Sequence, residues 1–218
     1  GIKPQVYLVG EDWSDDAEIK EYYQSGIDSL FAFRFAQSSG DILQYTATGQ
    51  GQQLIKKLVS YDGKMHSVNP DYINAMFLSN HDQIRIANAL EGKGVPAMKF
   101  AANIYMLAPG NSFTYYGEEI GMLAPGTDSD KYYRLPMVFD SDNPQQIVVD
   151  GYTAAEATAK AGVKQQLADK DSLLNHYRRL ITVKLQHPEI ARGRISKQQD
   201  FGDPQIGAYY IEKDGAKL

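Results

Sequence analysis

Short, largely apolar runs that end abruptly in polar residues recur along the chain. They occupy residues 6–9, 29–33, 75–78 and 112–116, and each has the length of a buried strand. Between them lie segments with apolar residues three and four positions apart, which is typical of amphipathic helices. This alternation of strands and helices predicts a parallel α/β architecture.

Three helices are expected between these strands. The first covers residues 16–24 and ends near Gly26, a residue that readily adopts the left-handed conformation found after helices. The second buries an apolar face of residues 54–59, and Thr48 is expected to cap its start. The third covers residues 95–107.

The clearest helical pattern follows a long irregular segment at residues 122–168, in which an Ala-rich piece at 153–161 is a weaker helical candidate. Asp169 or Asp171 is expected to cap the clear helix, and His187-Pro188 ends it. Its apolar stripe consists of Leu173, Leu174, Tyr177, Leu180, Ile181 and Leu185.

The pattern changes after Gly193. Residues 194–198 and 205–212 alternate between apolar and polar positions, with a turn sequence at 201–204 between them. This alternation predicts antiparallel strands and the beginning of a second structural module.

Composition excludes several classes of function. The chain has 218 residues, of which 43% are hydrophobic, and this is enough for one large domain or two small ones. The net charge of -5 and the scattered basic residues provide no patch for nucleic acid. No run approaches the length of a membrane span, and the absence of cysteine excludes disulfides and thiolate sites.

Two of the strands end in chemically versatile side chains. Glu11 and Trp13 follow the first strand, and Asn80, His81 and Asp82 follow the third. Because active sites of (β/α) barrels lie at the carboxyl ends of the strands, this placement is typical of such a site. An open doubly wound sheet fits the same alternation, but no glycine-rich phosphate loop follows any strand.

Each of these residues has a simpler structural interpretation. Asn80 and Asp82 can bond the backbone of a polar turn, and Glu11 can stabilise the start of the helix that follows. His81 can be a surface histidine, whereas a metal ligand would need further ligands that do not cluster near it in the sequence.

Several motifs, in order and spacing, resemble the α-amylase superfamily of glycoside hydrolases, glycoside hydrolase family 13. They are Gly10-Glu11-Asp12-Trp13, Asn80-His81-Asp82-Gln83, Tyr115-Tyr116-Gly117-Glu118-Glu119, Arg134-Leu135-Pro136-Met137 and the helix that leads to His187-Pro188. The resemblance implies strands five to eight of a (β/α)8 TIM barrel at residues 1–188. It also implies the start of an all-β, sandwich-type domain at residues 189–218.

The resemblance also implies roles for individual residues. Glu11 is the general acid/base of a retaining mechanism, while His81 and Asp82 bind sugar hydroxyls and help to stabilise the transition state. Asn80, Trp13 and Arg85 are further candidates for contact with substrate. The aspartate nucleophile lies on strand four, upstream of this chain, so the chain alone should be inactive. In the family, the stretch that contains Glu118 and Glu119 is largely structural.

The expected substrate is an α-glucan or a malto-oligosaccharide. The alternatives are a transglycosylase that shares these residues and a non-catalytic relative that serves binding or assembly. The expected protein partner is the N-terminal half of the barrel or a second copy of the chain, because half a barrel exposes unpaired strand edges. Calcium remains open as a cofactor of the intact protein, and the resemblance does not favour chloride dependence.

Overall fold

Four short parallel strands form the centre of the fold. The computed structural model describes residues 6–143, 148–149, 152–153 and 161–218. Strand β1 (Val9–Gly10) pairs with β2 (Ser29–Leu30), and β3 (Ala75–Met76) pairs with β4 (Asn111–Ser112). A parallel bridge between Phe31 and Ala75 joins the two pairs, so the strands lie side by side in chain order. This is the arrangement of a partial barrel.

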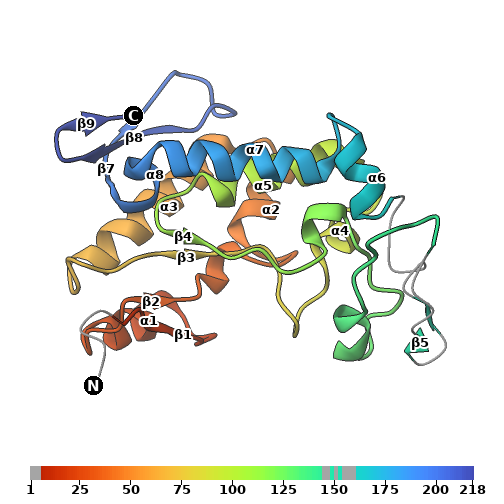
Figure 1. Cartoon of the computed structure of the whole chain (residues 1–218). Helices are drawn as coiled ribbons and strands as arrows, with labels where there is room; N and C mark the ends of the chain where they lie inside the picture. Colours follow the sequence, from red (N-terminus) through yellow and green to blue (C-terminus); the bar gives the residue numbers. More distant parts are fainter. Residues whose placement is uncertain (1–5, 144–147, 150–151, 154–160) are drawn as a thin grey trace.

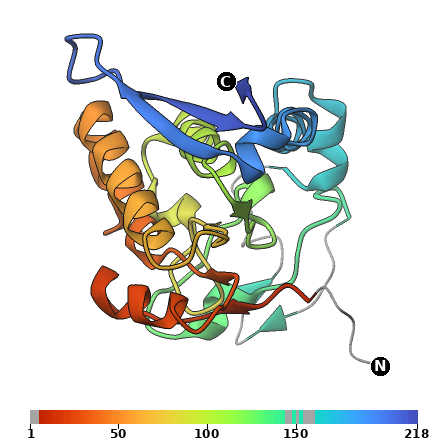
Figure 2. The same ribbon diagram turned by 90° about the vertical axis from the view of Figure 1, so that its left-hand side faces the viewer.

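The long helices cover one side of these strands. They are α1 (Asp16–Tyr23), α3 (Gly51–His66), α5 (Gly94–Met106) and α7 (Leu173–Gln186). Figure 1 shows α5 and α7 along β3 and β4, and Figure 2 shows the four helices as an arc outside the strands. The predicted alternation of strands and helices is therefore confirmed.

Shorter elements complete the chain. They are η1 (Phe33–Phe35), α2 (Asp41–Ala47), α4 (Ile86–Ala89), η2 (Glu118–Ile120), η3 (Asp130–Arg134), β5 (Val148–Val149), β6 (Tyr152–Thr153), α6 (Val163–Ala168) and α8 (Pro188–Arg192).

The two faces of the strand layer have different partners. Leu30 and Met76 are buried in the core cluster that the helices close over. The next residues along the chain, Phe31 and Phe77, point to the opposite face, where Phe113 joins them. The ring centroid of Phe31 lies 5.4 Å from that of Phe77 and 4.8 Å from that of Phe113, and both pairs have edge-to-face geometry. These three rings form an aromatic layer on the side away from the helices.

Two of the expected helix caps were wrong. Thr48 is the C-cap of α2, and the residue before α3 is Gln50, whose side chain makes no capping bond. Ser172 caps α7, where its Oγ accepts from Asn175 N at 3.1 Å. The carboxylate of Asp169 stabilises the turn before the helix, where Oδ1 accepts from Asp171 N at 2.9 Å.

The expected strands are longer than the observed ones, since only two residues of each form ladder pairs. Helix α2 was not expected, because its segment is rich in small and polar residues. It forms because Ile42 and Leu43 are buried in the core.

Within the irregular segment after Met122, the backbone of residues 138–139 lies beside the start of α6. Val163 N donates to Val138 O at 3.1 Å, and Lys164 N donates to Phe139 O at 2.9 Å. We call these four residues the neck. Most of the Ala-rich piece, residues 154–160, lies outside the described residues.

The C-terminal residues form a separate antiparallel sheet, as predicted. It contains β7 (Arg194–Gln199), β8 (Ala208–Lys213) and β9 (Ala216–Lys217), and lies beside α3 and α8 (Figure 1). The turn before β8 approaches the start of α3 so closely that a Cβ at Gly51 would lie 2.2 Å from Gln205 O. Glycine is therefore required at this contact.

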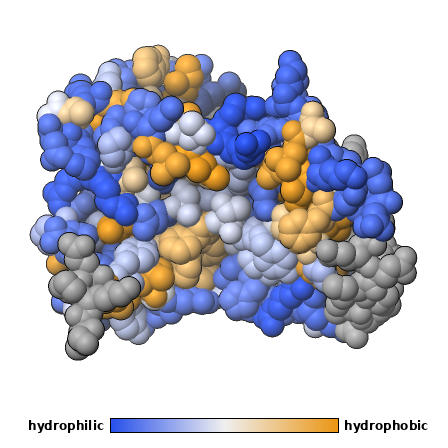
Figure 3. All heavy atoms as spheres, in the orientation of Figure 1, coloured by the Kyte–Doolittle hydropathy of each residue, from blue (hydrophilic) through white to orange (hydrophobic). Residues whose placement is uncertain are grey.

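The surface mixes polar and apolar residues. Figure 3 shows separate hydrophobic patches among hydrophilic residues on the face seen in Figure 1. Large exposed apolar side chains include Val6 and Leu8, just before β1, and among the described strands β1 pairs only with β2. No described helix is both long enough and apolar enough to span a membrane.

Candidate active site

A pocket of about 210 Å³ opens at the carboxyl ends of the four strands. Its floor is the aromatic layer of Phe31, Phe77 and Phe113. Its polar lining comes from the residues that follow β1, β3 and β4, namely Glu11, Ser79, Asn80, His81, Thr114 and Tyr115. The structure thus brings Glu11 and the Asn80-His81 pair together, although about 70 residues separate them in the sequence.

Glu11 is exposed and is oriented by Trp13. The indole Nε1 donates a hydrogen bond to Glu11 Oε1 at 2.8 Å. The indole ring itself packs against Phe33, with 4.3 Å between ring centroids. The capping role at the start of α1 belongs to Asp15, whose carboxylate accepts from two backbone N–H groups. The start of α1 therefore does not depend on Glu11.

The Asn80-His81-Asp82 segment combines a turn with a site. Asn80 Oδ1 accepts from Asp82 N at 3.0 Å, so the local-turn interpretation holds for the amide. The side chains of His81 and Asp82 remain 53% and 34% exposed, with His81 Nε2 3.2 Å from Asp82 Oδ2. The turn therefore presents an imidazole and a carboxylate together to solvent.

Arg134 is the neighbour of Asp82 that the sequence analysis did not assign. Its Nη2 lies 2.5 Å from Asp82 Oδ1, and its Nε donates to His81 O at 3.0 Å. Arg134 belongs to the Arg-Leu-Pro-Met motif, but the motif alone does not show which side chain it contacts.

Arg85 lies in the interior and not at the rim of the site, where substrate would be within reach. Only 2% of it is exposed. Its guanidinium stacks over the rings of Tyr115 and Tyr116 at 4.8 and 4.9 Å, and Nη1 donates to Tyr116 O at 2.8 Å. Burial lowers the pKa of this guanidinium. The reason for its position is that two aromatic faces offer a buried cation a favourable surface.

A second acidic cluster lies behind the pocket. Glu118 is 3% exposed, and its Oε1 accepts from Tyr177 Oη at 2.6 Å. Burial raises the pKa of Glu118 to about 7, and its hydrogen bonds to Tyr177 and Tyr105 offset part of this rise. Burial also raises the pKa of Glu119. Because Glu118 is enclosed by tyrosines, it suits the structural role that the family resemblance implies for this stretch.

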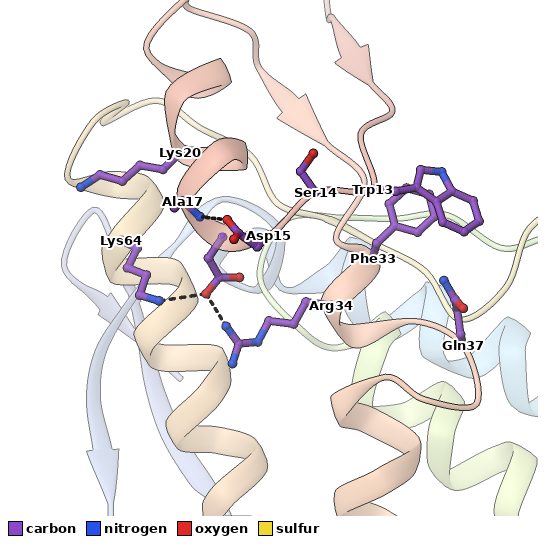
Figure 4. A pocket seen from close by; sticks show the side chains of 10 residues that line it. Trp13, Ser14, Asp15, Ala17, Lys20, Phe33, Arg34, Gln37 and Lys64 are labelled. Atoms are coloured by element: carbon purple, nitrogen blue, oxygen red, sulfur yellow. Dashed lines mark hydrogen bonds and ion pairs between the residues drawn. The ribbon is translucent and has the colours of Figure 1, made fainter.

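A wider groove of about 760 Å³ adjoins the site at Trp13 (Figure 4). Three of its charged side chains, those of Asp16, Arg34 and Lys64, form ion pairs. Asp16 bridges Arg34 and Lys64, with 2.8 Å to Lys64 Nζ, and Arg34 Nε also donates to Asp41 at 2.8 Å. These pairs tie α1 to α2 and α3. The smaller pocket holds the reactive groups, so we take it as the candidate active site.

Within the described residues, no group of three or more histidine or acidic side chains is arranged to hold a metal ion.

Comparisons with known proteins agree with this geometry. Residues 1–193 match the family model described as "Alpha amylase, catalytic domain". The whole chain aligns with Alpha-amylase SusG of Bacteroides thetaiotaomicron at 32% identity, covering 32% of that protein. It also aligns with Alpha-amylase 3 of Dictyoglomus thermophilum at 31% identity, covering 42% of that protein.

A solved structure gives the same result. The alpha-amylase from H.orenii superposes with a TM-score of 0.80 at 33% identity, over 98% of this chain and 42% of that one. The chain spans less than half the length of each of these relatives. The resemblance inferred from the motifs is confirmed, and the chain belongs to the α-amylase family of glycoside hydrolases as part of its catalytic domain.

Proposed function

We propose that the complete protein containing this chain is a retaining α-glucan hydrolase. It cleaves α-glucosidic bonds by double displacement. The observation that carries the proposal is the convergence of Glu11 and His81 on one pocket, with Asp82 beside His81, in an α-amylase catalytic domain. The exposed Trp13, which is hydrogen-bonded to Glu11, suits a sugar polymer, because the indole offers a flat apolar face.

The residues divide the reaction between them. Glu11 donates a proton to the glycosidic oxygen as the bond breaks, and then removes a proton from the attacking water. Trp13 holds Oε1, which leaves Oε2 of the same carboxyl group to carry the proton. His81 and Asp82 bind sugar hydroxyls, and Asn80 shapes the turn that carries them. Arg85 was expected to contact substrate. We propose instead that it supports the wall of the pocket, because it stacks on Tyr115.

A retaining mechanism needs a second carboxyl about 5 to 5.5 Å from the first. The family resemblance assigns this nucleophile to a strand upstream of residue 1. We therefore propose that β1 to β4 are strands five to eight of the barrel and that residues 189–218 begin a β-domain. The end of the family match at residue 193 supports this boundary, since β7 begins at Arg194. The apolar residues before β1 suit pairing with the preceding barrel strand or with a second copy.

The decisive test is product stereochemistry. The complete protein is incubated with soluble starch and with pullulan, and the anomer released first is identified by proton NMR. The α-anomer is expected, whereas initial release of the β-anomer would exclude retention. Products longer than the substrate would indicate glucan transfer, and absence of turnover on both polymers would favour the non-catalytic alternative.

The chain by itself provides the second test. The 218-residue chain should release no sugar above the blank, because by this proposal the nucleophile lies upstream of residue 1. Turnover by the isolated chain would show that the nucleophile lies within it.

A further inference from the structure

Arg134 contacts the His81-Asp82 segment through two separate atoms. Nη2 binds the Asp82 carboxylate at 2.5 Å, and Nε donates to the His81 carbonyl at 3.0 Å. One guanidinium therefore fixes both the side chain of Asp82 and the backbone that carries His81. The planar, forked geometry of guanidinium allows this double contact, which an ammonium group cannot reproduce.

The backbone of Arg134 is itself held on both sides. Tyr115 Oη donates to the carbonyl of Tyr133 at 3.0 Å, and Tyr116 Oη donates to the carbonyl of Leu135 at 2.7 Å. We call these two tyrosines the clamp. Leu135 is fully buried in the second core cluster. The main chain at this point is therefore fixed, although the Arg134 side chain is 47% exposed.

The clamp is anchored in turn by Arg85. This buried guanidinium stacks on both tyrosine rings and donates to Tyr116 O. Arg85 follows Asp82 by only three residues. The contacts therefore form a closed circuit from Asp82 through Arg85, the clamp and Arg134 back to Asp82. Such a circuit fixes the relative position of its members before any substrate binds.

Folding stability does not explain this arrangement. A half-exposed ion pair contributes little to the free energy of unfolding. Arg134 also lies 3.5 Å from Asp130 on its own turn, but its contact with Asp82 is an ångström shorter. The guanidinium is thus directed at the site in preference to its nearest acidic neighbour in sequence.

We propose that Arg134 is a positioning residue for the reaction, which acts by holding Asp82 and the His81 backbone in the orientation that the sugar requires. This inference rests on the proposed glucan hydrolase function. Residues 133–135 of the long loop thus belong to the site, because the clamp holds their backbone.

The test uses the complete protein with Arg134→Ala, Arg134→Lys and, as a matched control, Asp130→Asn. Arg134→Ala should lower kcat by about 100-fold with a smaller change in KM, since misplacing a catalytic group carries about that cost. Arg134→Lys should recover only part of kcat, and added guanidinium ion should rescue Arg134→Ala in a saturable manner. Asp130→Asn should stay within about twofold of wild type, and no variant should lower the melting temperature appreciably.

Two results would overturn the inference. One is wild-type kcat in Arg134→Ala. The other is a loss of activity that follows a fall in melting temperature and is not rescued by guanidinium.

Hydrogen exchange, a measurement that does not depend on catalytic turnover, tests this inference separately from the proposed function. If the wild-type protein hydrolyses no α-glucan, the proposed function fails, and hydrogen exchange at residues 80–83 then tests the positioning alone. Faster exchange in Arg134→Ala than in Asp130→Asn supports the positioning role, and equal exchange refutes it. If the wild type is active and Arg134→Ala keeps its kcat, only the inference fails.

Discussion

Two groups of ionisable residues lie close to each other in this domain and differ in their contact with water. Glu11, His81 and Asp82 are accessible at the pocket, whereas Glu118 and Arg85 are 3% and 2% exposed behind it. Both groups combine acidic and basic side chains, and the residues of both follow β1, β3 or β4 in the chain. The two groups differ in solvent exposure more than in residue type or strand position.

The charges of the buried group lose free energy of hydration, whereas the exposed group stays in contact with water. Burying a charge is unfavourable unless partners compensate for it. Among the described residues, Glu118 Oε2 and two nitrogens of Arg85 have no hydrogen-bond partner. What compensates is the surrounding set of tyrosines, which stack on Arg85 and donate to Glu118. The buried group is therefore expected to affect stability, and the exposed group to affect rate.

The largest expected difference in kcat is between two variants that each change one glutamate to glutamine, one in the exposed group and one in the buried group. Glu11→Gln in the complete protein should lower kcat by about 10²- to 10⁴-fold, because the general acid/base is lost. Glu118→Gln should keep kcat close to wild type. Steady-state hydrolysis of a malto-oligosaccharide measures both. An equal loss in the two variants would abolish the distinction between the groups.

Removal of Arg85 should produce the next largest effect. Arg85→Ala loses two cation–π contacts and a backbone hydrogen bond, with an expected cost of about 3 to 4 kcal/mol in the free energy of unfolding. Arg134→Ala is the control, since its half-exposed ion pair contributes about 1 kcal/mol or less. Urea denaturation of the two variants measures the contrast. Equal destabilisation would mean that burial does not distinguish the two arginines.

The raised pKa of Glu118 predicts a pH dependence of stability. Its pKa is about 7 in the folded protein against an ordinary value of 4.5, so the folded state holds the proton more tightly. The resulting stabilisation is complete below about pH 4.5 and is lost as the pH rises through 7, with a total on the order of 3 kcal/mol.

Glu118→Gln isolates this contribution. Urea midpoints of wild type and variant, compared at about pH 5 and about pH 8, should show a steeper decline with pH for the wild type. Parallel pH profiles would mean that Glu118 does not titrate in this range.

The smallest expected effect concerns the orientation of Glu11. Trp13→Phe keeps an aromatic ring beside Phe33 but removes the indole donor to Glu11 Oε1. Loss of one such hydrogen bond should lower kcat by about 3- to 10-fold, the equivalent of about 1 kcal/mol. The initial rate at saturating substrate measures this change. An unchanged kcat would show that the indole serves packing alone.

The sequence was sufficient to predict that the exposed residues lie together at the carboxyl ends of the strands. Glu11 and the Asn80-His81-Asp82 turn each follow a short apolar run, and parallel strands bring such ends together. Their signal is local, because the strand and its polar end lie within about ten residues.

The contacts that hold the group in place could not be predicted. Arg134 is 52 residues from Asp82, and the carbonyl that accepts from Arg85 is 31 residues away. A charged residue three positions after Asp82 would ordinarily face solvent. Its burial depends on two tyrosines from another strand end, and no periodicity in the sequence reports that contact.

The neck gives the domain a practical advantage for protein engineering. The backbone hydrogen bonds of the neck hold residues 138–139 beside residues 163–164, downstream of the clamp that fixes Arg134. A graft or a fluorescent tag inserted between the two sides of the neck should therefore leave the contacts of the clamp with residues 133–135 in place.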